Sequence, residues 1–148
     1  MIDSRHEAHR PYAARSHAAQ CLAPCCSVLL AEEYPGSATF ARRALERLGS
    51  DVLAMPSVDA AVVASRSRRF DLILLDLWLP DIRAVYAIRP MRLGEAHSAA
   101  DPVRIVVITS RCLPRDRGRH LEAGASAVLV KSFEPACLLA FVDHETQR

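Results

Sequence analysis

The sequence predicts an α/β fold, a three-layer and doubly wound sandwich in which helices cover both faces of a five-stranded parallel sheet. Short apolar runs alternate five times with stretches whose apolar residues recur at helical spacing. The connections between them are short, which favours parallel strands with right-handed crossovers. With 148 residues, 51% hydrophobic and 24% charged, the chain has the composition of one soluble globular domain.

The first half of the folded region contains two strand and helix units. The apolar runs at residues 27–31 and 52–55 are short and continuous, which favours buried strands. A helix between them has apolar residues at helical spacing and ends at Gly49, and a second helix opens near Pro56. The core-facing residues expected from these two helices are Phe40, Ala41, Ala44, Leu45, Leu48, Val58, Ala61, Val62 and Ala64.

The second half contains three further strands and their helices. The third strand is flanked by carboxylates and is apolar within, as expected for a central parallel strand covered on both faces. The fourth helix is the least regular, because Pro114 and Gly118 interrupt its sequence. The strands are expected over residues 71–76, 103–108 and 127–130, the third helix over 83–93, and a last helix from Glu134-Pro135 with Phe133, Leu138, Leu139 and Val142 facing inward.

Residues 1–26 are expected to form a disordered or weakly helical extension, because they show no sustained apolar period, and residues 27–148 form the domain. The five cysteines are odd in number and follow no secretory signal, which predicts reduced thiols and a cytoplasmic protein. No apolar run approaches the roughly 20 residues needed to cross a bilayer. The 19 basic and 17 acidic residues are nearly balanced, so neither a membrane nor a nucleic acid is an expected partner.

Polar side chains gather where the predicted strands end. Glu32 and Glu33 follow the first strand, Asp76 ends the third, Thr109 follows the fourth, and Lys131, the only lysine, follows the fifth. Ligands of doubly wound sheets bind at this edge. Three carboxylates repel one another unless a cation lies among them, and oxygen ligands suit Mg²⁺. With an ammonium and a hydroxyl nearby, the set predicts phosphoryl transfer onto Asp76.

These residues resemble the receiver domain of bacterial response regulators. The resemblance rests on the acidic pair, on Asp76 within Asp71-Leu72-Ile73-Leu74-Leu75-Asp76-Leu77-Trp78-Leu79-Pro80, on Thr109, on Gly124-Ala125 before the fifth strand, and on Lys131-Ser132-Phe133. It spans about residues 27 to 145. The resemblance implies the flavodoxin-like strand order 2-1-3-4-5.

The resemblance also implies a role for each site residue. Asp76 would accept a phosphoryl group from a histidine kinase or phosphotransfer protein, with Mg²⁺ as the required ion. Glu33, Asp76 and the main-chain carbonyl of Trp78 would bind the ion, Glu32 would assist through water, Thr109 would be the switch hydroxyl, and Lys131 would pair with the phosphoryl group.

The chain departs from the family pattern at four places. Two glutamates replace a pair that usually includes aspartate, and their longer side chains could displace the ion. Arg83-Ala84 stands where Asp-Gly is usual, and Val128 stands where an aromatic residue usually moves with the switch hydroxyl. Ser132 replaces a proline whose peptide bond is cis, and a non-proline cis bond costs about 3 kcal/mol.

Three functions follow as hypotheses. The first is a stand-alone phosphoacceptor receiver that signals through protein contact, using a face made basic by Arg111, Arg115, Arg117, Arg119 and His120, although a merely solvated face explains these charges as well. The second is a pseudo-receiver, an interaction module that is not phosphorylated, which the four departures favour. The third is a phosphohydrolase, which is disfavoured because Trp78 stands where such an enzyme needs a second aspartate. The chain is therefore not expected to be an enzyme.

Overall fold

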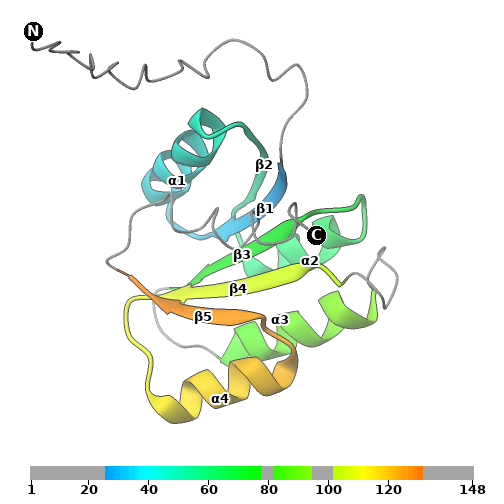
Figure 1. Ribbon diagram of the computed structural model, residues 1–148, viewed down its shortest axis with the longest axis vertical. Helices are drawn as coiled ribbons and strands as arrows, with labels where there is room; N and C mark the ends of the chain where they lie inside the picture. Colours follow the sequence, from blue (N-terminus) through cyan, green and yellow to red (C-terminus); the bar gives the residue numbers. More distant parts are fainter. Residues whose placement is uncertain (1–25, 78–81, 95–101, 132–148) are drawn as a thin grey trace, which may run out of the picture.

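The computed structural model describes residues 26–77, 82–94 and 102–131 (Figure 1). Its five strands form one parallel sheet in the order β2-β1-β3-β4-β5, and every neighbouring pair runs in the same direction. The predicted fold class and strand order are confirmed. The expected extension before β1 and the expected last helix lie outside the described residues, except that Cys26 begins β1.

The elements alternate strictly along the chain, as the apolar pattern predicts. In order they are β1 (Cys26–Glu32), α1 (Pro35–Arg47), β2 (Ser50–Met55), α2 (Val58–Ser65), β3 (Leu72–Leu77), α3 (Ile82–Leu93), β4 (Arg104–Thr109), α4 (Pro114–Ala123) and β5 (Ala127–Val130).

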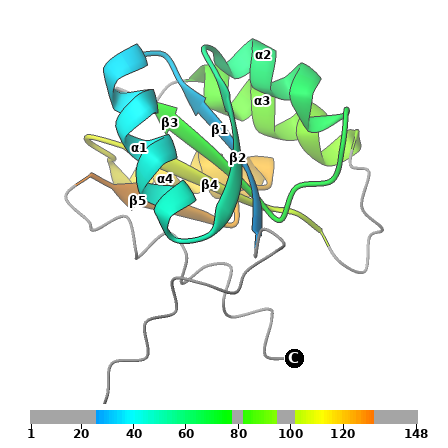
Figure 2. The same ribbon diagram turned by 90° about the horizontal axis from the view of Figure 1, so that it is seen from above.

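Helices cover both faces of the sheet (Figure 2). On one face, Leu45 of α1 packs among alternate strand residues such as Leu30 and Leu74. On the other face, side chains of α2, α3 and α4, such as Ile88, pack against the intervening strand residues such as Leu75. The period of two along each strand therefore divides the apolar residues between two cores.

The α4 helix forms despite the two residues that interrupt its pattern. Pro114 occupies its first turn, where a missing N–H costs nothing because no carbonyl of the helix is there to accept it. Gly118 lies inside the helix, and Gly124 ends it with a φ of 118°, a conformation that glycine adopts readily. Arg117 then donates from Nη1 to the main-chain oxygen of Val128 at 3.0 Å, which attaches α4 to β5.

The prediction that Phe40 and Leu48 face the core is wrong. Phe40 is 71% exposed and Leu48 is 45% exposed. The buried stripe of α1 runs through Ala41 and Leu45, one turn apart, and Phe40 lies on a different side of the helix. Leu48 is already the cap residue beyond the last turn. Within the described ranges, no helix is long and apolar enough to cross a membrane.

Candidate functional site

The register of the central strands brings two carboxylates together. Glu32 at the end of β1 is paired with Asp76 of β3, and Asp76 is in turn paired with Ile108 of β4. Neighbouring residues of parallel strands point to the same face, so Glu32 and Asp76 share the face covered by α1. β1 and β3 are neighbours whose following helices lie on opposite faces, which makes this edge the switch point where ligands bind.

Lys131 reaches this pair from the end of β5. Its Nζ lies 2.8 Å from Oδ1 of Asp76, and its side chain is 36% exposed whereas that of Asp76 is 12% exposed. The main-chain N–H of Lys131 donates to the carbonyl of Thr109 at 2.7 Å, which fixes the chain as it leaves the strand. The structure therefore brings together two of the three residues predicted for phosphoryl transfer, the acceptor and the lone lysine.

Glu32 is nearly fully buried, with 3% of its surface exposed. Its Oε1 accepts a hydrogen bond from the main-chain N–H of Tyr34 at 3.0 Å. Its Oε2 is buried and meets no hydrogen-bond donor among the described residues, so a hydrogen bond to Asp76 requires a proton on one of the two carboxyl groups. Burial and, after it, a side-chain hydrogen bond with Asp76 raise the pKa of Glu32 to about 7, because both favour the neutral carboxyl. The N–H of Tyr34 and the charge of Lys131 lower this pKa by a smaller amount.

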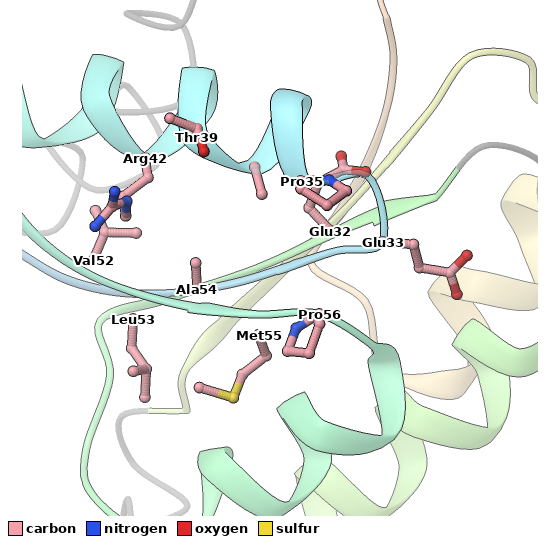
Figure 3. A pocket seen from close by; sticks show the side chains of 11 residues that line it. Glu32, Glu33, Pro35, Thr39, Arg42, Val52, Leu53, Ala54, Met55 and Pro56 are labelled. Carbon is pink, nitrogen blue, oxygen red and sulfur yellow. The ribbon is translucent and has the colours of Figure 1, made fainter.

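Glu33 lies differently from Glu32. Its Oε1 is 3.2 Å from Nη1 of Arg83, at the start of α3, and both side chains are largely exposed. Figure 3 shows the two glutamate side chains pointing in different directions. The structure thus places Glu32, and not Glu33, beside Asp76. The resemblance assigned the direct contact with the ion to Glu33.

Thr109 is fully buried at the end of β4. It is paired with Leu77, one residue beyond Asp76, so its side chain starts from the opposite face of the sheet. Its hydroxyl donates to the main-chain oxygen of Arg111 at 3.0 Å. Thr109 therefore lies at the predicted edge, with its hydroxyl engaged by its own loop.

The donor atoms of Glu32 and Asp76 are suited to a hard divalent cation. Mg²⁺ prefers carboxylate oxygens and retains several waters, so two adjacent carboxylates and an unpartnered buried oxygen are compatible with it. Across the described part of the chain, no three acidic, histidine or cysteine side chains form a metal-binding group. The predicted carbonyl ligand of Trp78 lies outside the described residues.

Sequence reasoning missed the ion pair between Arg83 and Glu33. The signal was present, because Arg83 stands at one of the departures from the family pattern. Helices that follow parallel strands begin at the carboxyl edge of the sheet, so a basic residue in the first turn of α3 is close to acids that follow β1. A second departure, Val128, is a buried core residue of β5.

Comparison with known proteins identifies the family. Residues 28–143 match the model of the response regulator receiver domain. The chain belongs to this family, whose members are generally signalling modules of two-component systems rather than enzymes.

Curated relatives include larger proteins. The chain is 31% identical over 119 residues to the aerobic respiration control sensor protein ArcB of Escherichia coli strain K12, a match that covers 80% of this chain and 15% of ArcB. It is 33% identical over 107 residues to the KDP operon transcriptional regulatory protein KdpE of the same organism, covering 72% of this chain and 45% of KdpE. The chain thus matches less than half the length of these two relatives.

A similar solved structure is the receiver domain of sensor histidine kinase PA1611 from Pseudomonas aeruginosa PAO1. The sequence identity is 29% and the TM-score is 0.67, and the match covers 83% of this chain and 98% of that one. That receiver domain was solved with a magnesium ion coordinated in its active site cleft.

Proposed function

We propose that this chain is a phosphoacceptor receiver domain in which Asp76 accepts a phosphoryl group from a histidine kinase or phosphotransfer protein. The observation that carries the proposal is the 2.8 Å ion pair between Lys131 and Asp76 at the carboxyl edge of the sheet. An acceptor carboxylate needs a neighbouring cation, because three phosphoryl oxygens bring negative charge close to its own. The only lysine of the chain is in that position.

The transfer has a simple balance of bonds. An oxygen of Asp76 attacks phosphorus, the bond from phosphorus to the imidazole nitrogen of the donor histidine breaks, and that nitrogen keeps the electron pair. Lys131 then pairs with a phosphoryl oxygen in place of the carboxylate. Thr109 would donate to another phosphoryl oxygen after its hydroxyl leaves the carbonyl of Arg111.

Mg²⁺ is the proposed ion, supported by the magnesium in the PA1611 receiver domain. When bound, it would neutralise charge on the phosphoryl oxygens. Glu32 and Asp76 are the proposed side-chain ligands, since they lie side by side and Oε2 of Glu32 is unpartnered in the described region. Glu33 would join them only by leaving Arg83, and the carbonyl of Trp78 remains a proposed ligand.

Phosphorylation by a small acyl phosphate tests the proposal. We expect acetyl phosphate and Mg²⁺ to add one acid-stable, base-labile phosphoryl group, detected by intact-protein mass spectrometry. Asp76→Asn should abolish the adduct, because an amide is not a nucleophile at neutral pH. Asp71→Asn is the matched control, since Asp71 precedes the same strand at its other end and accepts a hydrogen bond from Ser27. An unmodified wild-type protein, or an adduct that persists in Asp76→Asn, contradicts the proposal.

The pseudo-receiver is the second candidate function. It is favoured by the engagement of Glu33 with Arg83 and by the raised pKa of Glu32, both of which weaken the site for a cation. In this case acetyl phosphate gives no adduct even at high Mg²⁺ concentration, and the wild type and Asp76→Asn behave alike.

The proposed partners are a histidine kinase or phosphotransfer protein upstream and a protein of unknown identity downstream, with neither nucleic acid nor membrane. Sensor proteins among the relatives support the upstream partner. We place the protein in the cytoplasm, because the sequence has five cysteines, an odd number, and a reducing compartment keeps thiols unpaired.

A further inference from the structure

A groove of about 440 Å³ runs along the outer edge of the sheet, between α1 and β2. Thr39 and Arg42 of α1 form one wall, and residues Val52 to Met55 of β2 form the floor (Figure 3). Four consecutive residues of β2 line it, whose side chains alternate between the two faces of the sheet, so the groove reaches the edge of the strand itself.

β2 is an edge strand whose middle residues include no charged residue and no proline. Among the described strands it pairs with β1 alone, so its other side presents main-chain N–H and C=O groups without a strand partner. Charge and proline, which commonly block unwanted pairing, are confined to its two ends. Asp51 forms a 3.0 Å ion pair with Arg68 at the start, and Pro56 follows the last residue.

The two ends of the groove carry side chains of opposite charge, each with a counter-charge nearby. Arg42 lies 3.9 Å from Glu46 of the same helix, and Glu33 lies 3.2 Å from Arg83. Arg42 extends toward Val52 at the start of β2, whereas Glu32 and Glu33 line the other end, beside Pro56 (Figure 3). If a second copy of the strand is laid antiparallel along the first, the start of each strand meets the end of the other. The basic end of each groove then meets the acidic end of its copy, which makes the edge complementary to itself.

We propose that this edge is a homodimer interface, in which β2 pairs antiparallel with β2 of a second copy and Arg42 of each copy approaches the acidic end of the other groove. A two-fold axis perpendicular to the sheet joins the two sheets into one and keeps both α1 helices on the same face. The pairing supplies partners for main-chain groups of both edges and covers the partly exposed flank of Val52 to Met55. The interface is small, so the dimer is weak and depends on concentration.

Sedimentation equilibrium on the complete chain, from micromolar to millimolar concentration, tests the proposal. We expect a monomer–dimer equilibrium in which dimerisation weakens as salt increases, because the side chains of Arg42 and Glu33 are exposed to solvent. Arg42→Glu should weaken dimerisation by about tenfold or more, since it places like charges together at both ends of the interface. Thr39→Trp should abolish it by filling the groove.

Two matched controls lie on the same helix. Arg43→Glu makes the same change of charge, and Ser37→Trp makes a similar increase in size, at exposed positions that do not line the groove. Both should dimerise as the wild type does, and circular dichroism checks that every variant is folded. In a mixture of isotope-labelled and unlabelled protein, intermolecular nuclear Overhauser effects should join the main chain of Val52 to Met55 across the two-fold axis.

Three results would overturn the inference. The first is a monomer at every concentration, and the second is a dimer that Arg42→Glu leaves unchanged. The third is a set of intermolecular contacts that lie elsewhere, which would assign the dimer to another surface. If the groove binds only an extended peptide from another protein, the chain remains a monomer at every concentration, which is the first of these results. The measurements are made without Mg²⁺ or a phosphoryl donor, so none of these results depends on whether Asp76 can be phosphorylated.

Discussion

The two ends of the sheet differ in how completely their polar groups are hydrogen-bonded. At the amino ends of β4 and β5, the guanidinium of Arg92 donates to the main-chain oxygen of Gly124 at 2.9 Å and 2.8 Å and also donates to the carbonyl of Val103. Ser126 accepts from the N–H of Ile105 at 3.1 Å. At the carboxyl ends, by contrast, a buried oxygen of Glu32 lies beside Asp76 without a hydrogen-bond partner in the described chain.

This difference suggests that one end of the sheet contributes to stability and the other to the proposed binding function. Hydrogen bonds from a guanidinium to buried carbonyls hold α3 against the turn that precedes β5, and leaving such carbonyls unpaired is costly. A buried carboxylate without a hydrogen-bond donor is costly, and the raised pKa of Glu32 reflects that cost. The amino end therefore stabilises the fold, and the carboxyl end is the one that we propose to bind a cation and a phosphoryl group.

Arg92→Ala is expected to give the largest effect. Removal of the side chain leaves the carbonyls of Gly124 and Val103 without this donor, which should lower the free energy of unfolding by about 3 kcal/mol. Urea denaturation measures the change. Arg89→Ala, an exposed arginine of the same helix, should change it by less than about 0.5 kcal/mol. Equal stabilities of the two variants would contradict the structural role of Arg92. Loss of phosphorylation in folded Arg92→Ala would contradict the separation of stability and binding between the two ends of the sheet.

Glu32→Gln should remove a dependence of stability on pH. The folded-state pKa of Glu32, about 7, lies above the ordinary value of 4.5, so its favourable contribution is complete below pH 4.5 and is lost as pH rises through 7. Glutamine mimics the neutral carboxyl, so the variant should match the wild type near pH 4.5 and exceed its stability by roughly 2 kcal/mol at pH 8. Urea denaturation in a chelating buffer measures this, and equal stabilities at pH 8 would contradict it.

Lys131→Ala should slow phosphorylation by acetyl phosphate by about tenfold or more. The ammonium that now pairs with Asp76 would no longer stabilise the incoming phosphoryl oxygens, a loss equivalent to about 1.4 kcal/mol or more. Stability should change by less than about 1 kcal/mol, since the lysine is partly exposed and its ion pair is screened by solvent. Initial rates from mass spectrometry provide the measurement. An unchanged rate would mean that this contact does not serve the transfer.

Arg83→Ala should have the smallest effect, a few-fold gain in affinity for Mg²⁺. Glu33 would lose its cationic partner, and the negative potential of the acidic pair would increase. Isothermal titration calorimetry measures the affinity, and Arg89→Ala is again a control on the same helix. A weaker affinity in Arg83→Ala would show that the arginine supports the cation site and does not compete with it.

Much of the fold could be predicted from the sequence, because each strand is a short apolar run and the first two helices have apolar residues at helical spacing. The residues at which the strands end were harder to predict from the sequence. The first strand was expected to end at Ala31, whereas β1 extends to Glu32 and directs that carboxylate toward Asp76. Hydrogen bonds to neighbouring strands decide where a strand ends, and those neighbours are distant in sequence.

The sequence by itself determined the order of strands and helices and the edge of the sheet at which Asp76, Thr109 and Lys131 would stand, because apolar periodicity is a local property. The tertiary structure decided which of two adjacent glutamates lies beside Asp76, which arginine engages the other, and where the hydroxyl of Thr109 donates. These depend on register and on side-chain direction past the ends of strands. Both are set by contacts between residues that are far apart along the chain.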